Sequence, residues 1–241
     1  MPRLDVLLAR NLVCSRTAAA TLIRAGRVRD AAGAVLDDRR AEIAAAALPA
    51  TVVIDDERRL ELHDAFHALL NKPLGVVTAL RDERHPTAFA LLRDAPLAGE
   101  LRAVGRLDLD TSGLLLWTTD GQWVQRLTHP KRQVPRTYQA ALARPFRAPP
   151  GDLALEDGHR PTIRALGTIE RVAAHPALAV PPDTEVLAEI TVVSGAYHEV
   201  RRIFAALGSH VLGLCRVAIG RLPLPRDLAP GAYVAVALTE V

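Results

Sequence analysis

Apolar segments of strand length, separated by turns and proline-rich loops, are the feature that most restricts what this chain can fold into. From Phe66 onward they mix with short helical patterns, without the regular strand–helix–strand alternation of a doubly wound parallel sheet. The clearest helix is HEVRRIFAALG, residues 198–208, where apolar residues recur at helical spacing and a glycine follows as a cap. The sequence therefore predicts an α+β fold.

Several other elements can be read from the pattern of apolar residues. Strands are predicted in HALLNKPLGVVTAL (67–80), LLLWTTDG (114–121), RTYQAALA (136–143) and EVLAEITVV (185–193), with a short helix in QWVQRLTHP (122–130). The helix at 198–208 is predicted to bury Val200, Ile203, Phe204 and Leu207.

The first 58 residues read as a separate small module. Two helices are predicted, the second beginning after Ser15, whose side chain suits an N-cap, and ending at Gly26 in a left-handed cap. Short strands at 27–29 and 51–54 complete a helix–helix–hairpin unit. Residues 55–64, DDERRLELHD, are dense in charge and predict a linker, so the expected domains are 1–58 and 59–241.

Arginine dominates the basic residues, supplying 28 of the 30 lysines and arginines. Codon usage explains such an excess as well as function does, although the planar guanidinium suits phosphate better than an ammonium group. The excess is strongest in residues 1–29, where six arginines face Asp5 alone. The module is thus a candidate for following a phosphate backbone.

Other classes of protein are excluded by composition. No apolar run approaches the roughly 20 residues that cross a bilayer, and charges interrupt any signal-peptide core, so no membrane association is expected. Cys14 and Cys215 are too few for a disulfide scaffold or a four-cysteine metal site. No metal is expected, and a reducing cytoplasm is the predicted compartment.

The sharpest local signal is GRLDLDTSGLLLWTTDG, residues 105–121, a polar turn that opens onto a buried strand. Taken alone, Arg106 and Asp108 could be an ordinary surface ion pair worth under about 1 kcal/mol. The stretch, however, strongly resembles the catalytic loop of the pseudouridine synthases, in the RsuA branch that modifies ribosomal RNA. LNKPLG (70–75), RTY (136–138) and YHEVRRIFAALGSHV (197–211) resemble further motifs of that branch in the same order.

The resemblance covers nearly the whole chain and implies a fold, a reaction and a set of roles. The implied fold has a small N-terminal RNA-binding module of the ribosomal S-four type and a larger catalytic domain with a mixed, mostly antiparallel sheet flanked by helices. The implied reaction detaches uracil from ribose, turns it and rejoins it through carbon, and it needs no cofactor. Asp108 would be the essential carboxylate, Tyr138 the active-site tyrosine, and Arg201 the cation that pairs with Asp108.

These residue types fit the chemistry. A carboxylate can act on the sugar as a nucleophile or as a base, and the sequence does not separate the two routes. We expect Asp108 to lie in a pocket that excludes water, where an adjacent Arg201 would favour the ionised form through two N–H groups. Tyr138 offers a ring for stacking on the base and a hydroxyl donor. The alternative role of Tyr138 is that of a core tyrosine on a strand. If the register slips by one residue, Arg202 takes the role assigned to Arg201.

Two further groups of residues are predicted to hold RNA. Lys72 and Arg106 are assigned to substrate binding, with Arg106 either filling the space left by the extruded base or binding a phosphate. In the N-terminal module the candidates are Arg3, Ser15, Arg16, Arg24, Arg27 and Arg29.

Details of the motifs favour one RNA over another. HPKRQVPRTY has features of sister branches that modify large-subunit RNA, whereas GQW (121–123), YHEVRR and DLAPGAY, ending at Tyr233, are closer to RsuA itself. The leading hypothesis is therefore a monomeric synthase that modifies 16S ribosomal RNA, free or in a small-subunit particle. The alternatives are a 23S ribosomal RNA synthase and a non-catalytic ribosome-binding or assembly factor.

Overall fold

This computed structural model describes residues 1–238, and the chain divides into two units. The first unit begins with helices α1 (Leu4–Leu12) and α2 (Arg16–Arg24). As predicted, the Ser15 side chain caps α2 by accepting from the backbone N–H of Ala18, and Gly26 follows the helix at φ 66°. No single described helix is long and apolar enough to cross a membrane; α1 and α2 satisfy length and composition criteria only together, as a pair bent by 116°.

The first unit is completed by a three-stranded antiparallel sheet of β1 (Val28–Asp30), β2 (Ala50–Ile54) and β3 (Arg58–Leu62). The prediction of a linker at 55–64 was wrong, because β3 occupies the middle half of it. Leu60 and Leu62 alternate with charged residues, so one face of the strand packs inward, and Leu62 is fully buried in the core formed with both helices. Residues 1–66 and 93–101 make up this unit.

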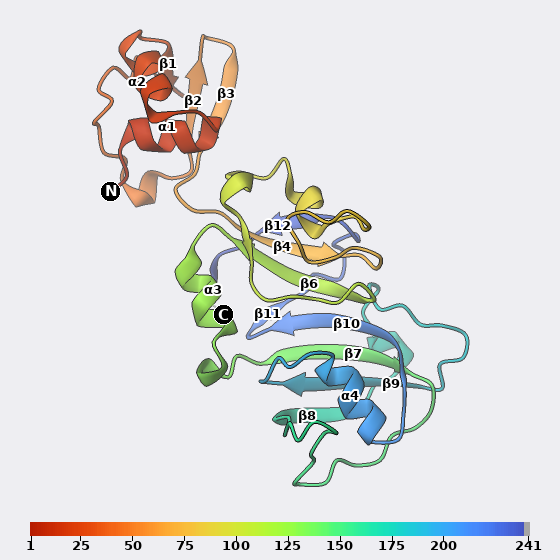
Figure 1. The fold of residues 1–241 in the computed structure, drawn as a ribbon. Helices are drawn as coiled ribbons and strands as arrows, with labels where there is room; N and C mark the ends of the chain where they lie inside the picture. Colours follow the sequence, from red (N-terminus) through yellow and green to blue (C-terminus); the bar gives the residue numbers. More distant parts are fainter. Residues whose placement is uncertain (239–241) are drawn as a thin grey trace. The chain divides into compact units, whose positions relative to one another are not determined.

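The second unit is built on a nine-stranded sheet (Figure 1). Its main path runs β12–β4–β6–β10–β7–β9–β8, with β5 beside β6 and β11 beside β10. Neighbouring strands are antiparallel except for β6 and β10, which are parallel, so the predicted mixed and mostly antiparallel sheet is confirmed. The strands are β4 (His67–Lys72), β5 (Arg102–Ala103), β6 (Thr111–Thr118), β7 (Arg136–Leu142), β8 (Ile163–Thr168), β9 (Val186–Val192), β10 (Val211–Ile219), β11 (Leu222–Pro223) and β12 (Tyr233–Ala235).

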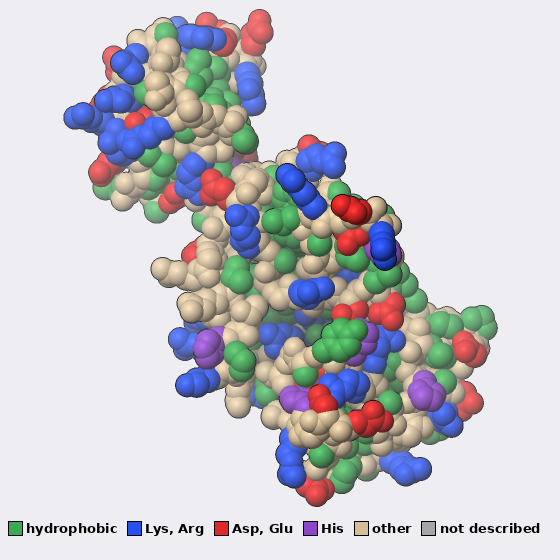
Figure 2. Space-filling model, in the orientation of Figure 1, with side chains coloured by type: hydrophobic (Ala, Val, Ile, Leu, Met, Phe, Trp, Pro, Cys, Tyr) green, Lys and Arg blue, Asp and Glu red, His purple; other side chains and the backbone are tan. Residues whose placement is uncertain are grey.

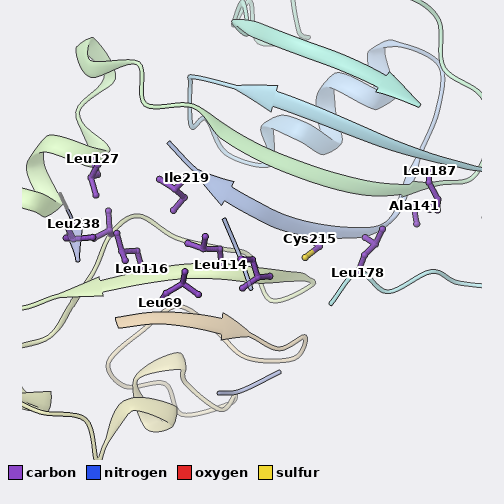
Figure 3. Packing of buried hydrophobic residues seen from close by; sticks show 12 residues of the cluster. Leu69, Leu114, Leu116, Leu127, Ala141, Leu178, Leu187, Cys215, Ile219 and Leu238 are labelled. Atoms are coloured by element: carbon purple, nitrogen blue, oxygen red, sulfur yellow. The ribbon is translucent and has the colours of Figure 1, made fainter. Parts of the chain in front are cut away.

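Helices α3 (Gly121–Thr128) and α4 (Glu199–Ala206) belong to this unit, and each contributes to a separate hydrophobic cluster. Leu127 of α3 joins Leu69, Leu114 and Leu116 of β4 and β6 in the first cluster (Figure 3). Short 3₁₀ helices lie at Ala45–Ala47, Ala88–Leu92, Ala98–Glu100, Pro130–Arg132 and Arg171–Ala173.

Alternation along the strands separates the two clusters onto opposite faces of the sheet. On β7, Ala141 belongs to the first cluster and its neighbour Ala140 to the second. The second cluster contains the predicted buried face of α4, and the side of the sheet that it covers is called the α4 face below. The predicted α+β class is thus confirmed, with helices packed on a central sheet.

Candidate active site

Four of the five predicted site residues of the second unit line one cavity of about 650 Å³, and the fifth, Lys72, lies outside its lining. Asp108 and Arg106 reach it from the loop between β5 and β6, Tyr138 from β7 and Arg201 from α4. These residues come from segments up to about a hundred positions apart in the sequence. The fold therefore brings them to a single hollow.

The loop that carries Asp108 is fixed by hydrogen bonds on both sides. The Thr78 hydroxyl donates to the Leu107 carbonyl at 2.8 Å and accepts from the Leu107 N–H at 3.1 Å. The Gly75 N–H donates to the Leu109 carbonyl, and the Thr111 N–H donates to that of Asp108 itself. This bracing sets the backbone on which the carboxylate is presented.

Asp108 is less enclosed than the sequence predicts. Its side chain is 38% exposed, and the basic side chain in contact with it is His198, with Nε2 3.6 Å from Oδ2. Arg201 instead binds Asp110, with Nη2 2.9 Å from Oδ2, and also donates to the Asp110 and Val211 carbonyls. The structure brings Arg201 and Asp108 to the same cavity but does not join them in an ion pair, because Asp110 engages the guanidinium first.

A row of side chains crosses the α4 face beside this loop. The pairing registers place Lys72 of β4 next to Gly113 of β6, Gly113 next to Arg216 of β10, and Arg216 next to Tyr138 of β7. Residues paired across neighbouring strands project to the same face, so three polar side chains line up around a glycine. A Cβ at Gly113, where φ is 101°, would clash with the Arg216 backbone and the Cys215 sulfur, so only glycine allows this close pairing.

Arg216 is the site residue that the sequence analysis missed. It is only 2% exposed, lines the cavity, and places Nη1 3.5 Å from the Tyr138 hydroxyl and its guanidinium 5.9 Å from the ring centre. Nε donates to the Leu114 carbonyl at 2.8 Å. A signal was present, since LCRVAIG puts a single charge inside an apolar strand, and buried charges are rare without a purpose.

Lys72 lies fully buried at the other end of the row. Its ammonium donates to the Pro73 and Val76 carbonyls at 2.9 and 2.7 Å. Burial lowers the pKa of Lys72 from 10.5 to about 8, while the negative charges of Asp108 and Asp110 oppose the decrease. Lys72 is therefore close enough to Asp108 to feel its charge, although it does not line the cavity.

The candidate RNA-binding residues of the first unit are mostly engaged within the protein. Arg3 and Arg16 both bind the buried carboxylate of Asp5. Burial favours a higher pKa for Asp5, but the two arginines outweigh that effect and lower the pKa. Arg27 pairs with Asp55 and Arg29 with Asp56, Ser15 serves as the cap of α2, and Arg24 donates to the Ala20 carbonyl. Figure 2 shows blue side chains gathered on one flank of this unit with red carboxylates beside some of them.

No group of three or more histidine, cysteine, aspartate or glutamate side chains that could hold a metal ion occurs among residues 1–238. Cys215 is buried, which raises the pKa of its thiol to about 11, and Cys14 is half-buried.

Comparison with known proteins decides the family. The model of the RNA pseudouridylate synthase family matches residues 67–206, which contain Asp108, Tyr138 and Arg201. The chain belongs to the RNA pseudouridylate synthases. It is 38% identical to the ribosomal small subunit pseudouridine synthase A of Vibrio cholerae, covering 96% of this chain and 94% of that protein. The corresponding protein of Escherichia coli K12 is 36% identical over the same shares.

A comparison of three-dimensional structures gives the same family. A crystal structure described as a pseudouridylate synthase aligns over 100% of this chain and 98% of its own, with 32% identity and a TM-score of 0.54. As a pseudouridylate synthase the chain is an isomerase, and the resemblance noted in the motifs is confirmed.

Proposed function

We propose that this protein isomerises a specific uridine of 16S ribosomal RNA to pseudouridine, with Asp108 as the essential carboxylate. The observation that carries the proposal is full-length similarity to synthases named for the ribosomal small subunit, together with the cavity that collects the motif residues. We further propose a monomer acting where ribosomal RNA is made and modified, which in a bacterial cell is the cytoplasm.

The reaction requires the C1′–N1 bond of uridine to break and a C1′–C5 bond to form. Asp108 acts on the ribose in one of two ways, as a nucleophile at C1′ or as a base on the sugar. In either case the carboxylate must be ionised, and the partly exposed Asp108 is surrounded by positive charge from His198 when protonated, and from Lys72. A bound nucleotide would cover the carboxylate and strengthen these interactions by excluding water.

The other predicted residues act in binding. Tyr138 presents its ring to the cavity for stacking on the extruded base, and Arg106, exposed at the rim, fills the space that the base leaves or holds a phosphate. Arg201 is placed to exchange Asp110 for Asp108 when RNA enters, since both lie on the same loop. The first unit, predicted as residues 1–58 and extended through β3 to residue 66 with residues 93–101 added, supplies affinity for folded RNA rather than chemistry.

Asp108→Asn tests the central role. We expect pseudouridine formation on 16S ribosomal RNA to be lost while RNA binding stays close to that of the native protein, because the side chain keeps its size and only the charge is removed. Asp110→Asn is the matched control two residues away, and it should retain activity because Arg201 leaves Asp110 for Asp108 when RNA enters. Full activity of Asp108→Asn would remove Asp108 from the mechanism.

A map of pseudouridines in ribosomal RNA from cells lacking the protein tests the substrate. Loss of one site in the small subunit supports the proposal, and loss of a site in the large subunit selects a 23S ribosomal RNA synthase instead. A complete set of pseudouridines with incompletely assembled subunits would point to a non-catalytic assembly factor.

A further inference from the structure

Two buried cations, Arg216 and Lys72, and the half-buried Arg136 lie around the cavity with no carboxylate within ion-pair distance in the described part of the chain. Arg216, Lys72 and Arg136 all direct their N–H groups at oxygens of the backbone, apart from the long contact between Arg216 and the Tyr138 hydroxyl. Burial lowers the pKa of Arg136 as it does that of Lys72, so each charge is held at a cost.

The cost of holding a charge away from water is greatest at Arg216. It is almost fully buried, yet Nη2 has no hydrogen-bond partner among residues 1–238, and Nη1 reaches its two acceptors only at 3.4 and 3.5 Å. An unpaired buried charge with an unused donor destabilises the folded protein unless a ligand completes it. The Arg216 guanidinium therefore lacks a negative partner.

Resting on the proposed reaction, we propose that Arg216, supported by Lys72 and Arg136, is the group that stabilises the uracil anion released when the C1′–N1 bond breaks. Both routes open to Asp108 produce this anion. In the first, a C1′–O bond to Asp108 forms as C1′–N1 breaks. In the second, Asp108 takes the proton from C2′, and the electron pair of that C–H bond forms a C1′=C2′ double bond as C1′–N1 breaks. In each, the electron pair of the C1′–N1 bond stays on uracil.

The remaining steps rejoin base and sugar without net gain or loss of atoms or electrons. C5 of the turned uracil attacks C1′, and Asp108 is either displaced or returns its proton to the sugar. C5 then loses its proton and N1 gains one, so the product is an isomer of the substrate. Negative charge on the base exists only between cleavage and rejoining, and fixed positive charge at the cavity wall favours that interval over the bound uridine.

Tyr138 transmits part of this effect. Because a guanidinium N–H can only donate, the Tyr138 oxygen accepts from Arg216 and its own O–H is left to donate into the cavity. The positive charge beside the phenol also strengthens that donor. Arg216 is thus a positioning residue for Tyr138 as well as a source of charge.

Single-turnover cleavage of two RNAs, one with uridine and one with 5-fluorouridine at the target, tests the proposal. Fluorine stabilises the uracil anion, so a variant without the stabilising charge should lose less with that substrate. We expect Arg216→Met to slow uridine by roughly 100-fold and 5-fluorouridine by about tenfold or less, scored by nuclease digestion and chromatography of the altered nucleoside. Arg226→Met is the control, an exposed arginine that donates to the Ala173 and Ala174 carbonyls and lies outside the cavity lining.

Thermal unfolding separates this role from a structural one. Replacing an unpaired buried charge by an apolar side chain of similar length should leave the melting temperature unchanged or raise it, whereas a structural arginine would lower it. Arg216→Lys, which keeps the charge but not the reach to Tyr138, should fall between Met and the native protein with uridine. It also carries the substrate comparison if Arg216→Met does not fold.

Equal slowing of both RNAs by these variants, or no slowing, overturns the inference. Absence of pseudouridine with the native protein would instead overturn the proposed function.

Discussion

Gly113→Ala is the most demanding test of the packing beneath the site. Gly113 has φ 101°, and an added Cβ would fall within 3 Å of the Arg216 nitrogen and the Cys215 sulfur and closer still to the Arg216 carbonyl oxygen. The backbone conformation costs an alanine about 1–2 kcal/mol, and forcing a methyl group into filled space costs about 1–3 kcal/mol more. Relief by a side-chain rotation is unavailable, because two of the three atoms belong to the backbone.

The expected loss is therefore about 2–5 kcal/mol of the free energy of unfolding, a large part of the total of about 5–15 kcal/mol for an ordinary domain. Urea titration followed by circular dichroism measures it directly. Gly167→Ala on β8 is the control, since its Cβ would meet open space, and it should change stability by under about 0.5 kcal/mol. A Gly113→Ala protein as stable as that control would refute the close approach of β6 and β10.

Two further predictions concern charge. Because the ammonium of Lys72 has a pKa of about 8, the rate of cleavage by the native protein should fall as the pH rises through that value, whereas Lys72→Arg should keep its rate to higher pH in single-turnover assays. Between pH values of about 8 and 10.5 the unfolded chain binds more protons at Lys72 than the folded protein does. The contribution of Lys72 to the free energy of unfolding therefore rises with pH over that range. In RNA binding, Arg24→Gln should reduce the slope of log K against log salt by about 1, whereas Arg27→Gln, whose guanidinium already neutralises Asp55, should change it less; equal slopes for the two variants would contradict the ion pair as the cause.

Local signals in the sequence were sufficient for much of the fold. The N-cap at Ser15, the glycine after α2 and the apolar face of α4 depend on neighbouring residues, so they could be predicted without a tertiary structure. The strand β3 was missed because its charged residues dominate the composition of 55–64, while the alternation of Leu60 and Leu62 is the signal that decides its structure.

Most residues of the site could be predicted from the sequence, but their contacts could not. The motifs identified Asp108, Tyr138 and Arg201, and all three line the cavity. Which acidic residue Arg201 binds, however, is decided by the path of a loop, and Asp110 differs from Asp108 by only two positions. A charge inside the apolar strand LCRVAIG marked Arg216 as unusual, but its place beside Gly113 and Tyr138 comes from the register of β10 against β6 and β7, which the sequence does not show.

The position of β10 also bears on how the protein matures. This strand lies between β6 and β7 although both precede it in the chain by some 70 residues or more. During translation the two earlier strands leave the ribosome without the neighbour that joins them, and they cannot close the central sheet until residues 211–219 have emerged. A nascent chain that carries Asp108 and Tyr138 but not yet residues 211–219 should therefore be inactive, because its cavity still lacks the strand that brings Arg216.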